Sequence, residues 1–300
     1  MTRTVTVGLD GSRESRAAAE WGPRGAAARR AAEAGPRLGA RTGAHRTGAA
    51  PRRRDPSALD REDSPRGRRR PAAASPRPRR DHHALSGRPA ELLVSTAKDA
   101  ELLVLGSRGL SGIGGFMVGS VGLSVVAHAE RPVVLVRVGE LASDEHEMDP
   151  AGIPTAATPF RPVVLGLDIE SPDAGLIGFA FEATARRGTS LRVVHGWNPP
   201  PYYAYGLAVD LELHGSLALR EATALTEFIR PWRTKYPDVE VTEECHYGTP
   251  GNHLVDASRE SSLIVVGRRI RRSPFGARIG PVTHAVLHHS TAPVAVVPHH

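Results

Sequence analysis

The sequence predicts an α/β fold built from two tandem, doubly wound parallel sheets, each formed by one repeat of alternating strands and helices. A glycine pattern that follows an apolar run occurs twice, starting at Gly106 and at Gly267, and the two copies align without a gap. A short apolar run that ends in an acid, Asp10 or Asp168, stands at a similar distance before each copy. Runs such as Leu263 to Val266 are typical of parallel strands that are covered on both faces.

The first half is predicted to be an incomplete repeat. A strand over Thr4 to Asp10 leads into a helix from Glu14, which we expect to end at Gly22-Pro23 because proline interrupts a helix. A recognisable pattern resumes near Leu85. The elements expected after that point are a helix from Arg88, a strand over Glu101 to Leu105, a helix over Ser120 to Ala129 and a strand over Pro132 to Val138.

The second half is predicted to be complete. Its strands are expected over Arg161 to Asp168, Leu191 to Trp197, Val239 to His246, Leu263 to Gly267 and Pro293 to Val297. Its helices are expected over Asp173 to Arg187, Asp210 to Lys235, Gly251 to Ser261 and Pro281 to His289. A chain of 300 residues suits two domains. We place them at residues 1–140 and 161–300, joined by a linker at 141–160.

Residues 22–84 do not fit the repeat. Between residues 22 and 81 there is no Val, Ile, Phe, Tyr, Trp or Met, and the only leucines are Leu38 and Leu59. That stretch holds 17 Arg against 6 acids, so it accounts for the net charge of +7 of the whole chain. It cannot bury enough apolar surface to offset the entropy of ordering, and we predict that residues 22–84 are disordered or non-native.

Two interpretations of this segment follow from its composition. One is a basic tether that binds nucleic acid or another anionic surface through charge alone, since no aromatic side chains are interleaved for specific binding. The other is translation in a shifted reading frame, which we prefer. Codons that encode Ala34 to Ala40 can be read one base later as Leu-Val-His-Val-Trp-Glu, which is similar to Leu191 to Trp197 of the second repeat.

The first glycine pattern indicates a phosphate site. Gly106 and Gly109 would let the backbone approach phosphate groups closely. Gly119 and Ser120 open the next helix, where backbone N–H groups and a hydroxyl can hold phosphate oxygens. Arg108 would neutralise charge. The alternative is that these glycines only make tight turns and that Asp10 caps a helix.

These residues carry a family resemblance. The pattern G-x2-G-x9-G-[S/T] after a strand, with V-x-V-G-x-D at the start, resembles the universal stress protein family in its tandem actinobacterial form. The resemblance covers most of residues 150–300, but only about residues 1–21 and 85–140 of the first half. It implies Rossmann-like sheets of order 3-2-1-4-5 and a pseudo-dimer in which the last strands of the two halves pair. It also leaves room for a homodimer.

The resemblance further implies a ligand and its place. ATP, alone or with Mg²⁺, would bind in the first half, with Asp10 near the adenosine. The second half departs from the pattern at Ile270 and Pro281, so we expect no nucleotide there. The arginines that flank Ile270 are interpreted as a solvated basic loop (Arg268, Arg269, Arg271 and Arg272).

Other residues exclude several function classes. A single cysteine, Cys245, fits a strand position in a protein of the reducing cytoplasm, and the chain has no apolar run of membrane-spanning length. The N-terminus leads directly into a strand, so we expect no signal peptide. His284 and His288 have a metal-binding spacing without a third ligand nearby in sequence, and we interpret them as helix-surface residues.

We therefore expect a cytoplasmic, ATP-sensing stress-response regulator without efficient catalysis, because no general base or nucleophile set is evident. It would make no specific contact with nucleic acid and would need no membrane. Four alternatives remain open. Three concern function: a scaffold that binds a partner through a degenerate site, an ATP-using enzyme of the adenine-nucleotide hydrolase-like fold, and a basic nucleic-acid-associated protein. The fourth is that the first domain is broken and only residues 150–300 fold independently.

Overall fold

The structure is a computed structural model. It describes residues 4–22, 86–107, 118–138, 142–153, 155–198, 211–270 and 278–300. The predictions for residues 23–84, and those for Arg108 and Gly109, lie outside the described residues. We call residues 1–140 the first half and residues 161–300 the second half.

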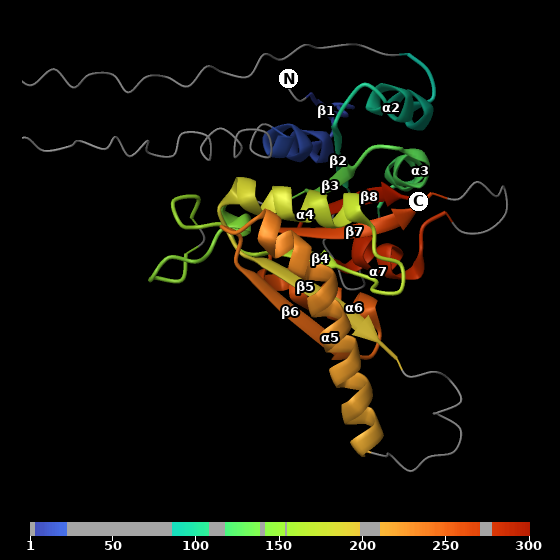
Figure 1. The fold of residues 1–300 in the computed structure, drawn as a ribbon. Helices are drawn as coiled ribbons and strands as arrows, with labels where there is room; N and C mark the ends of the chain where they lie inside the picture. The colour runs from blue at the N-terminus through green and yellow to red at the C-terminus, as the bar shows by residue number, and fades with distance from the viewer. Residues whose placement is uncertain are drawn as a thin grey trace, which may run out of the picture. The chain divides into compact units, whose positions relative to one another are not determined.

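The described strands of both halves form one sheet (Figure 1). The first half contributes β1 (Val5–Val7), β2 (Leu102–Ser107) and β3 (Val133–Arg137). The second half contributes β4 (Val163–Gly166), β5 (Leu191–Trp197), β6 (Val241–Tyr247), β7 (Leu263–Arg269) and β8 (Val294–His299). The strand order is β1-β2-β3-β8-β7-β4-β5-β6. The second half thus has the predicted order 3-2-1-4-5, and the first half has its strands 1, 4 and 5.

The helices alternate with the strands as predicted. In the first half residues 13–22 are helical, followed by α2 (Pro89–Ala97) and α3 (Ser120–His128). A 3₁₀ turn, η1 (Ala142–Glu145), precedes the second half. The helical elements of that half are α4 (Ala174–Arg187), α5 (Leu211–Lys235), α6 (Pro250–Ala257), the 3₁₀ turn η3 (Ser258–Glu260) and α7 (Pro281–His289).

The two halves join at one antiparallel strand pair. Within each half the strands pair in parallel, whereas β3 runs antiparallel to β8, with Val133 opposite Val296 and Leu135 opposite Val294. All five residues of β3 are buried, because strands flank it on both sides and helices cover it. This is the pairing of last strands that the sequence resemblance implied.

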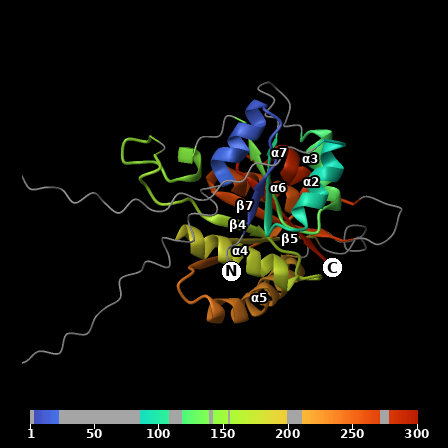
Figure 2. The same ribbon diagram turned by 90° about the horizontal axis from the view of Figure 1, so that it is seen from above.

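Each face of the sheet carries an apolar layer that crosses this seam. Because side chains alternate along a strand, Val134 of β3 lies in one layer with Ala295 of β8, while Val133 lies in the other layer with Val296. Helix 13–22, α4 and α5 cover the first face, and α2, α3, α6 and α7 cover the second. Figure 2 shows helix 13–22, in blue, on the opposite side of the first strands from α2 and α3.

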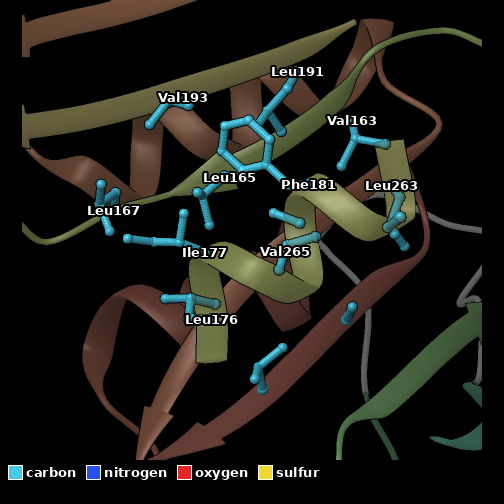
Figure 3. Close-up of a cluster of buried hydrophobic side chains, with 14 of the residues drawn as sticks. Val163, Leu165, Leu167, Leu176, Ile177, Phe181, Leu191, Val193, Leu263 and Val265 are labelled. Carbon is cyan, nitrogen blue, oxygen red and sulfur yellow. The ribbon is translucent and has the colours of Figure 1, made fainter. Parts of the chain in front are cut away.

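Helix α4 is the centre of the first layer (Figure 3). Its Phe181 is completely buried and lies among the apolar side chains of the central strands. The helix begins at Asp173, whose side chain accepts a hydrogen bond from the Leu176 N–H (2.9 Å), and ends at Gly188 with a φ of 61°. A left-handed residue at a helix end favours glycine, so local sequence sets both ends of α4.

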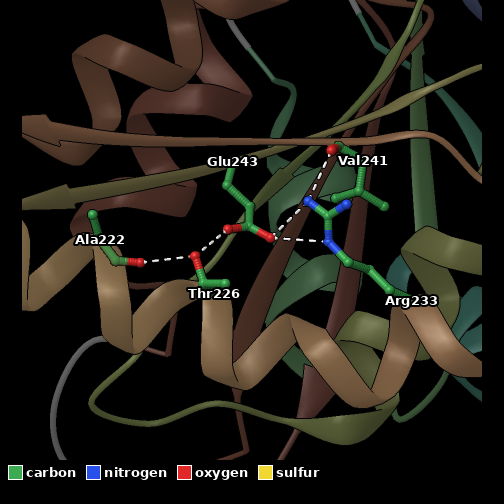
Figure 4. Close-up of polar contacts among 5 residues, drawn as sticks. All are labelled: Ala222, Thr226, Arg233, Val241 and Glu243. Atoms are coloured by element: carbon green, nitrogen blue, oxygen red, sulfur yellow. Dashed lines mark hydrogen bonds and ion pairs between the residues drawn. The ribbon is translucent and has the colours of Figure 1, made fainter.

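Helix α5 is attached to the edge strand β6 by charged groups (Figure 4). Arg233 donates to Glu243 Oε1 (2.8 Å) and to the carbonyl of Val241 (2.9 Å), and the Thr226 hydroxyl donates to Glu243 Oε2 (2.5 Å). A charged side chain on an edge strand also discourages pairing with another chain.

A buried polar junction connects the first helix to the second half. The Trp21 indole N–H donates to Glu145 Oε2 (3.2 Å), and Arg187 of α4 lies 3.9 Å from the same oxygen. The Arg187 guanidinium also stacks over the rings of Trp21 and Phe160, at 5.6 and 5.7 Å from their centroids. The predicted linker therefore contributes buried contacts.

Replacing Glu145 with alanine should lower the free energy of unfolding by about 3 kcal/mol, because Arg187 would lose its buried carboxylate partner. Glu91→Ala is the matched control, since the Arg88–Glu91 pair is exposed and should contribute less than about 1 kcal/mol. Denaturant unfolding of both variants measures the difference. Equal, small effects would show that the junction does not hold the first helix.

Candidate functional site

The described members of the predicted phosphate site lie at one edge of the sheet. β1 and β2 are parallel, so their carboxyl ends lie at the same edge of the sheet. Asp10 follows β1, and Gly106 lies near the end of β2. Helix α3 leads from that edge back to the start of β3, so Gly119 and Ser120 at its N-terminus lie there too. Ligands of doubly wound sheets bind at this edge.

Gly106 has a packing reason to be glycine. A Cβ atom at this position would lie 2.0 Å from the Glu14 carbonyl oxygen, 2.2 Å from the Glu14 carbonyl carbon and 2.8 Å from the Ser15 nitrogen. Strand β2 therefore approaches the backbone of helix 13–22 at a distance that no side chain permits. This contact explains Gly106 without a ligand, although through close packing and not through the tight turn that the sequence alternative named.

Gly119, unlike Gly106, has no close packing contact among the described residues. It is the N-cap of α3 with a φ of −61° and a ψ of 157°, a conformation that any residue adopts. Within the described part of the chain, no heavy atom lies within 4 Å of where its Cβ would be. The N-cap also makes no side-chain hydrogen bond to the first turn, and Ser120 is exposed. Among the described residues, open space therefore adjoins the uncapped N–H groups of α3, as an anion would require.

Asp10 takes part in a turn that both halves share. Its Oδ1 accepts the Ser12 N–H (3.0 Å), and in the second half Asp168 Oδ1 accepts the Glu170 N–H at the same distance. Hydrogen bonds from the Ser12 side chain and backbone hold the pKa of the exposed Asp10 carboxyl below its ordinary value. Ser12 in turn caps helix 13–22 by accepting the Ser15 N–H (3.1 Å). The second half has the same turn although its glycine pattern is altered, so the turn does not depend on that pattern.

The second half has the same open helix start at Gly280, the N-cap of α7, where a Cβ would meet no described atom within 4 Å, but it lacks the first N–H group. Pro281 is the first residue of α7 and has no N–H to offer, as the sequence indicated. The Ile270 N–H donates to the His299 carbonyl (2.6 Å), so it extends the pairing of β7 with β8. Its backbone donor at this position is therefore used within the sheet.

The interpretation of Arg268 as a solvated residue is wrong. Its side chain is buried, and Nη2 donates to the carbonyl of Ala129 in the first half. Burial, together with the nearby charge of Arg278, lowers the pKa of the guanidinium. The sequence did not indicate this role, because Ala129 lies far away in the chain. A cavity of about 540 Å³ adjoins this contact, lined by Ala127, His128, Glu130, Arg268, Ile270, Arg278 and His300.

The remaining candidate side chains lie in surroundings that indicate structural roles. Cys245 lies half-buried in β6, as predicted, and burial raises the pKa of its thiol, which disfavours the nucleophilic thiolate. The rings of His284 and His288 lie 4.3 Å apart on α7. Among the described residues no group of three His, Cys, Asp or Glu side chains has the arrangement of a metal site. None of the described helices is long and apolar enough to cross a membrane.

The fold and this edge define a class of protein: a tandem α/β protein whose halves are wound around parallel strands, with a glycine-led helix at the carboxyl edge. The chain belongs to the universal stress protein family. The model of that family matches residues 1–137 and 159–298, which confirms the resemblance drawn from the glycine pattern.

Mycobacterial relatives share this sequence over about 70% of the chain. Universal stress protein Rv2005c of Mycobacterium tuberculosis is 32% identical over 210 residues, which cover 69% of this chain and 65% of the relative. A universal stress protein of Mycolicibacterium smegmatis is 28% identical over 212 residues, with the same coverage. The chain therefore spans about 65% of the length of these relatives.

Solved structures show weaker likeness. A universal stress protein from Archaeoglobus fulgidus is 18% identical with a TM-score of 0.47, and the match covers 70% of this chain and 66% of that one. A universal stress protein in complex with cAMP is 22% identical with a TM-score of 0.34, covering 47% of this chain and 98% of that one.

The two glycines of the first half should respond differently to alanine. Gly106→Ala should lower the free energy of unfolding by about 2–3 kcal/mol, because the new methyl group meets the backbone of Glu14. Gly119→Ala should cost about 0.5 kcal/mol, since it meets open space and alters only a helix cap. Thermal and denaturant unfolding of both variants tests this, and similar losses would contradict the assignment.

Proposed function

We propose that this protein is a stress-response regulator that binds ATP in its first half and does not turn it over efficiently. The observation that carries the proposal is the start of α3. No described residue packs against Gly119, and its backbone conformation needs no glycine. The equivalent Gly280 is similar, but Ser120 brings an N–H and a hydroxyl where α7 has Pro281. A phosphate group fits that arrangement, because it accepts hydrogen bonds from a helix N-terminus and interacts favourably with the helix dipole.

The residues of the site take different parts in this proposal. The backbone N–H groups at Gly119 and Ser120, with the Ser120 hydroxyl, would bind phosphate oxygens. Arg108 would add charge and Gly109 close backbone approach, as the sequence indicated. Gly106 contributes indirectly by fixing helix 13–22 against β2. The exposed Asp10 carboxylate would border the nucleoside.

We propose that the protein hydrolyses ATP slowly at most, because of the groups available at this edge. Hydrolysis needs a base or an acceptor that orients water for in-line attack on the terminal phosphate. Among the described residues of the site, Asp10 is the carboxylate, and it already accepts the Ser12 N–H. ATP bound here would act as a ligand that changes conformation or choice of partner. Because the chain spans about 65% of its relatives, this regulatory role is proposed for the chain alone.

A second candidate function is a partner-binding protein that holds no nucleotide. The observation in its favour is that the described first half contains strands 1, 4 and 5 of the family order. Strand 2, which would border the adenine, is not among its described strands. Gly106 and Asp10 are also explained by packing and by a turn. In this case Gly119 would be a remnant of a nucleotide site.

Isothermal titration of the full chain with ATP, with and without Mg²⁺, tests the first candidate. We expect about one ATP per chain, and at least a tenfold loss of affinity in Gly119→Val, because its side chain would fill the space beside the N–H groups. The variant should remain folded, since a Cβ at this position would meet no described atom within 4 Å. Its unfolding curve provides the control for folding. Titration with cAMP serves as a second probe.

Two results separate the candidates. Absence of binding in a folded chain, or equal binding by the Gly119→Val variant, would contradict an ATP site at α3 and favour the partner-binding protein. Phosphate release from ATP should stay at background in the same samples. Release above background that Gly119→Val abolishes would instead assign the chain to the ATP-using enzymes.

A further inference from the structure

The first half presents an open strand at the end of the sheet. β1 is the terminal strand of the order and pairs on one side with β2 (Figure 1). Among the described residues no strand pairs with its other side. The backbone groups on that side are those of Val5, Val7 and Leu9. On the β2 side, the Thr4 carbonyl accepts the Glu101 N–H just before β2, and the Gly8 N–H donates to the Val104 carbonyl.

The second half shows what covers the equivalent edge. By the repeat, β4 corresponds to β1, with Val163 at the place of Val5 and Leu167 at the place of Leu9. The strand β5 lies parallel to β4 on that side. The N–H groups of Val163 and Leu167 donate to the carbonyls of Ser190 (3.0 Å) and Val194 (3.1 Å).

The two edges differ in the exposed fraction of their residues. Leu9 is 56% exposed, whereas Leu167 is 4% exposed. The three residues of β1 are half-buried, whereas Val163, Val164 and Leu165 are completely buried. The first half therefore exposes an apolar residue and a row of N–H and C=O groups that its counterpart covers with one strand.

Neither the composition of the intervening sequence nor the β6 end of a second copy fits that strand. Residues 22–81 contain no Val, Ile, Phe, Tyr, Trp or Met, so they lack the apolar β-branched and aromatic residues of such a strand. The other end of the described sheet in a second copy is β6, which carries Glu243 and Glu244 in ion pairs with Arg233 and Arg192. A strand next to β1 has to carry apolar residues on both faces, as β5 does with Val193 on one face and Val194 on the other.

We propose that the outer edge of β1 is a binding site for an extended, apolar segment of another polypeptide, which adds as a parallel strand in the manner of β5. The segment has leucine or β-branched residues on both faces and no proline at positions that donate to β1. The proposal concerns the sheet edge and is independent of nucleotide binding.

A labelled peptide with the sequence of Ser190 to Asn198 is the probe, with fluorescence anisotropy of the full chain as the measurement. Two N-methylated forms provide matched controls. The carbonyl of Val194 accepts from β4, so residue 194 faces the partner, whereas the Leu191 N–H donates to Glu240, so residues 191 and 193 face away. Methylation at Val194 should weaken binding at least tenfold, and methylation at Val193 by less than twofold.

Hydrogen exchange locates the bound peptide. The amide protons of Val5, Val7 and Leu9 should exchange at least tenfold more slowly with the peptide than without it. On the protein, Val5→Pro should weaken binding about tenfold, since it removes the donor equivalent to the Val163 N–H, while Val5→Ala retains that donor and should bind within about twofold. Both variants are checked for cooperative unfolding.

Any of three results would overturn the proposal. They are no binding of the unmodified peptide, equal binding of both methylated peptides, and strong protection of the Val5 and Leu9 amides in the free chain. The third result would mean that the chain already covers its own edge. Dimerisation of the chain that the peptide does not compete with would assign the edge to a second copy instead.

Discussion

The antiparallel pairing of β3 with β8 is the contact on which the structure of the first half depends. Three strands with their helices would bury little apolar surface by themselves, and small domains are marginal for that reason. Pairing across the seam lets both apolar layers continue into the complete second half. The Arg268 bond to Ala129 and the junction of Trp21, Glu145 and Arg187 add polar contacts between the halves. The second half thus supplies the core that the first half shares.

This dependence explains which parts of the glycine pattern remain informative about a ligand. Helix 13–22 is held by Trp21 at one end and by the glycine contact of β2 at the other, so Gly106 is required for packing. Asp10 is required for the turn before that helix. Packing among the described residues leaves the start of α3 unexplained, where Gly119 faces open space as Gly280 does before Pro281. The proposed nucleotide site therefore depends on that position more than on the full motif.

Local sequence predicted those elements whose limits are set within a few residues. The strand over Leu191 to Trp197 and the helix over Pro281 to His289 have the predicted bounds, since an apolar run defines the first and a proline at the first helical position starts the second. The buried roles of Glu145 and Arg268 were not predicted, because each depends on a partner that lies far away in the chain. The role of Gly106 was ambiguous for a different reason. A glycine that admits a ligand and one that admits a helix backbone look the same in sequence.

The most direct test of this account is whether the two halves unfold together. The chain has three tryptophans, with Trp21 in the first half and Trp197 and Trp232 in the second, so 5-fluorotryptophan labelling gives a fluorine NMR signal for each without a mutation. We predict that all three signals disappear at the same urea concentration, because the apolar layers are continuous across the seam. Loss of the Trp21 signal at a clearly lower urea concentration would contradict the claim that the second half holds the first half folded.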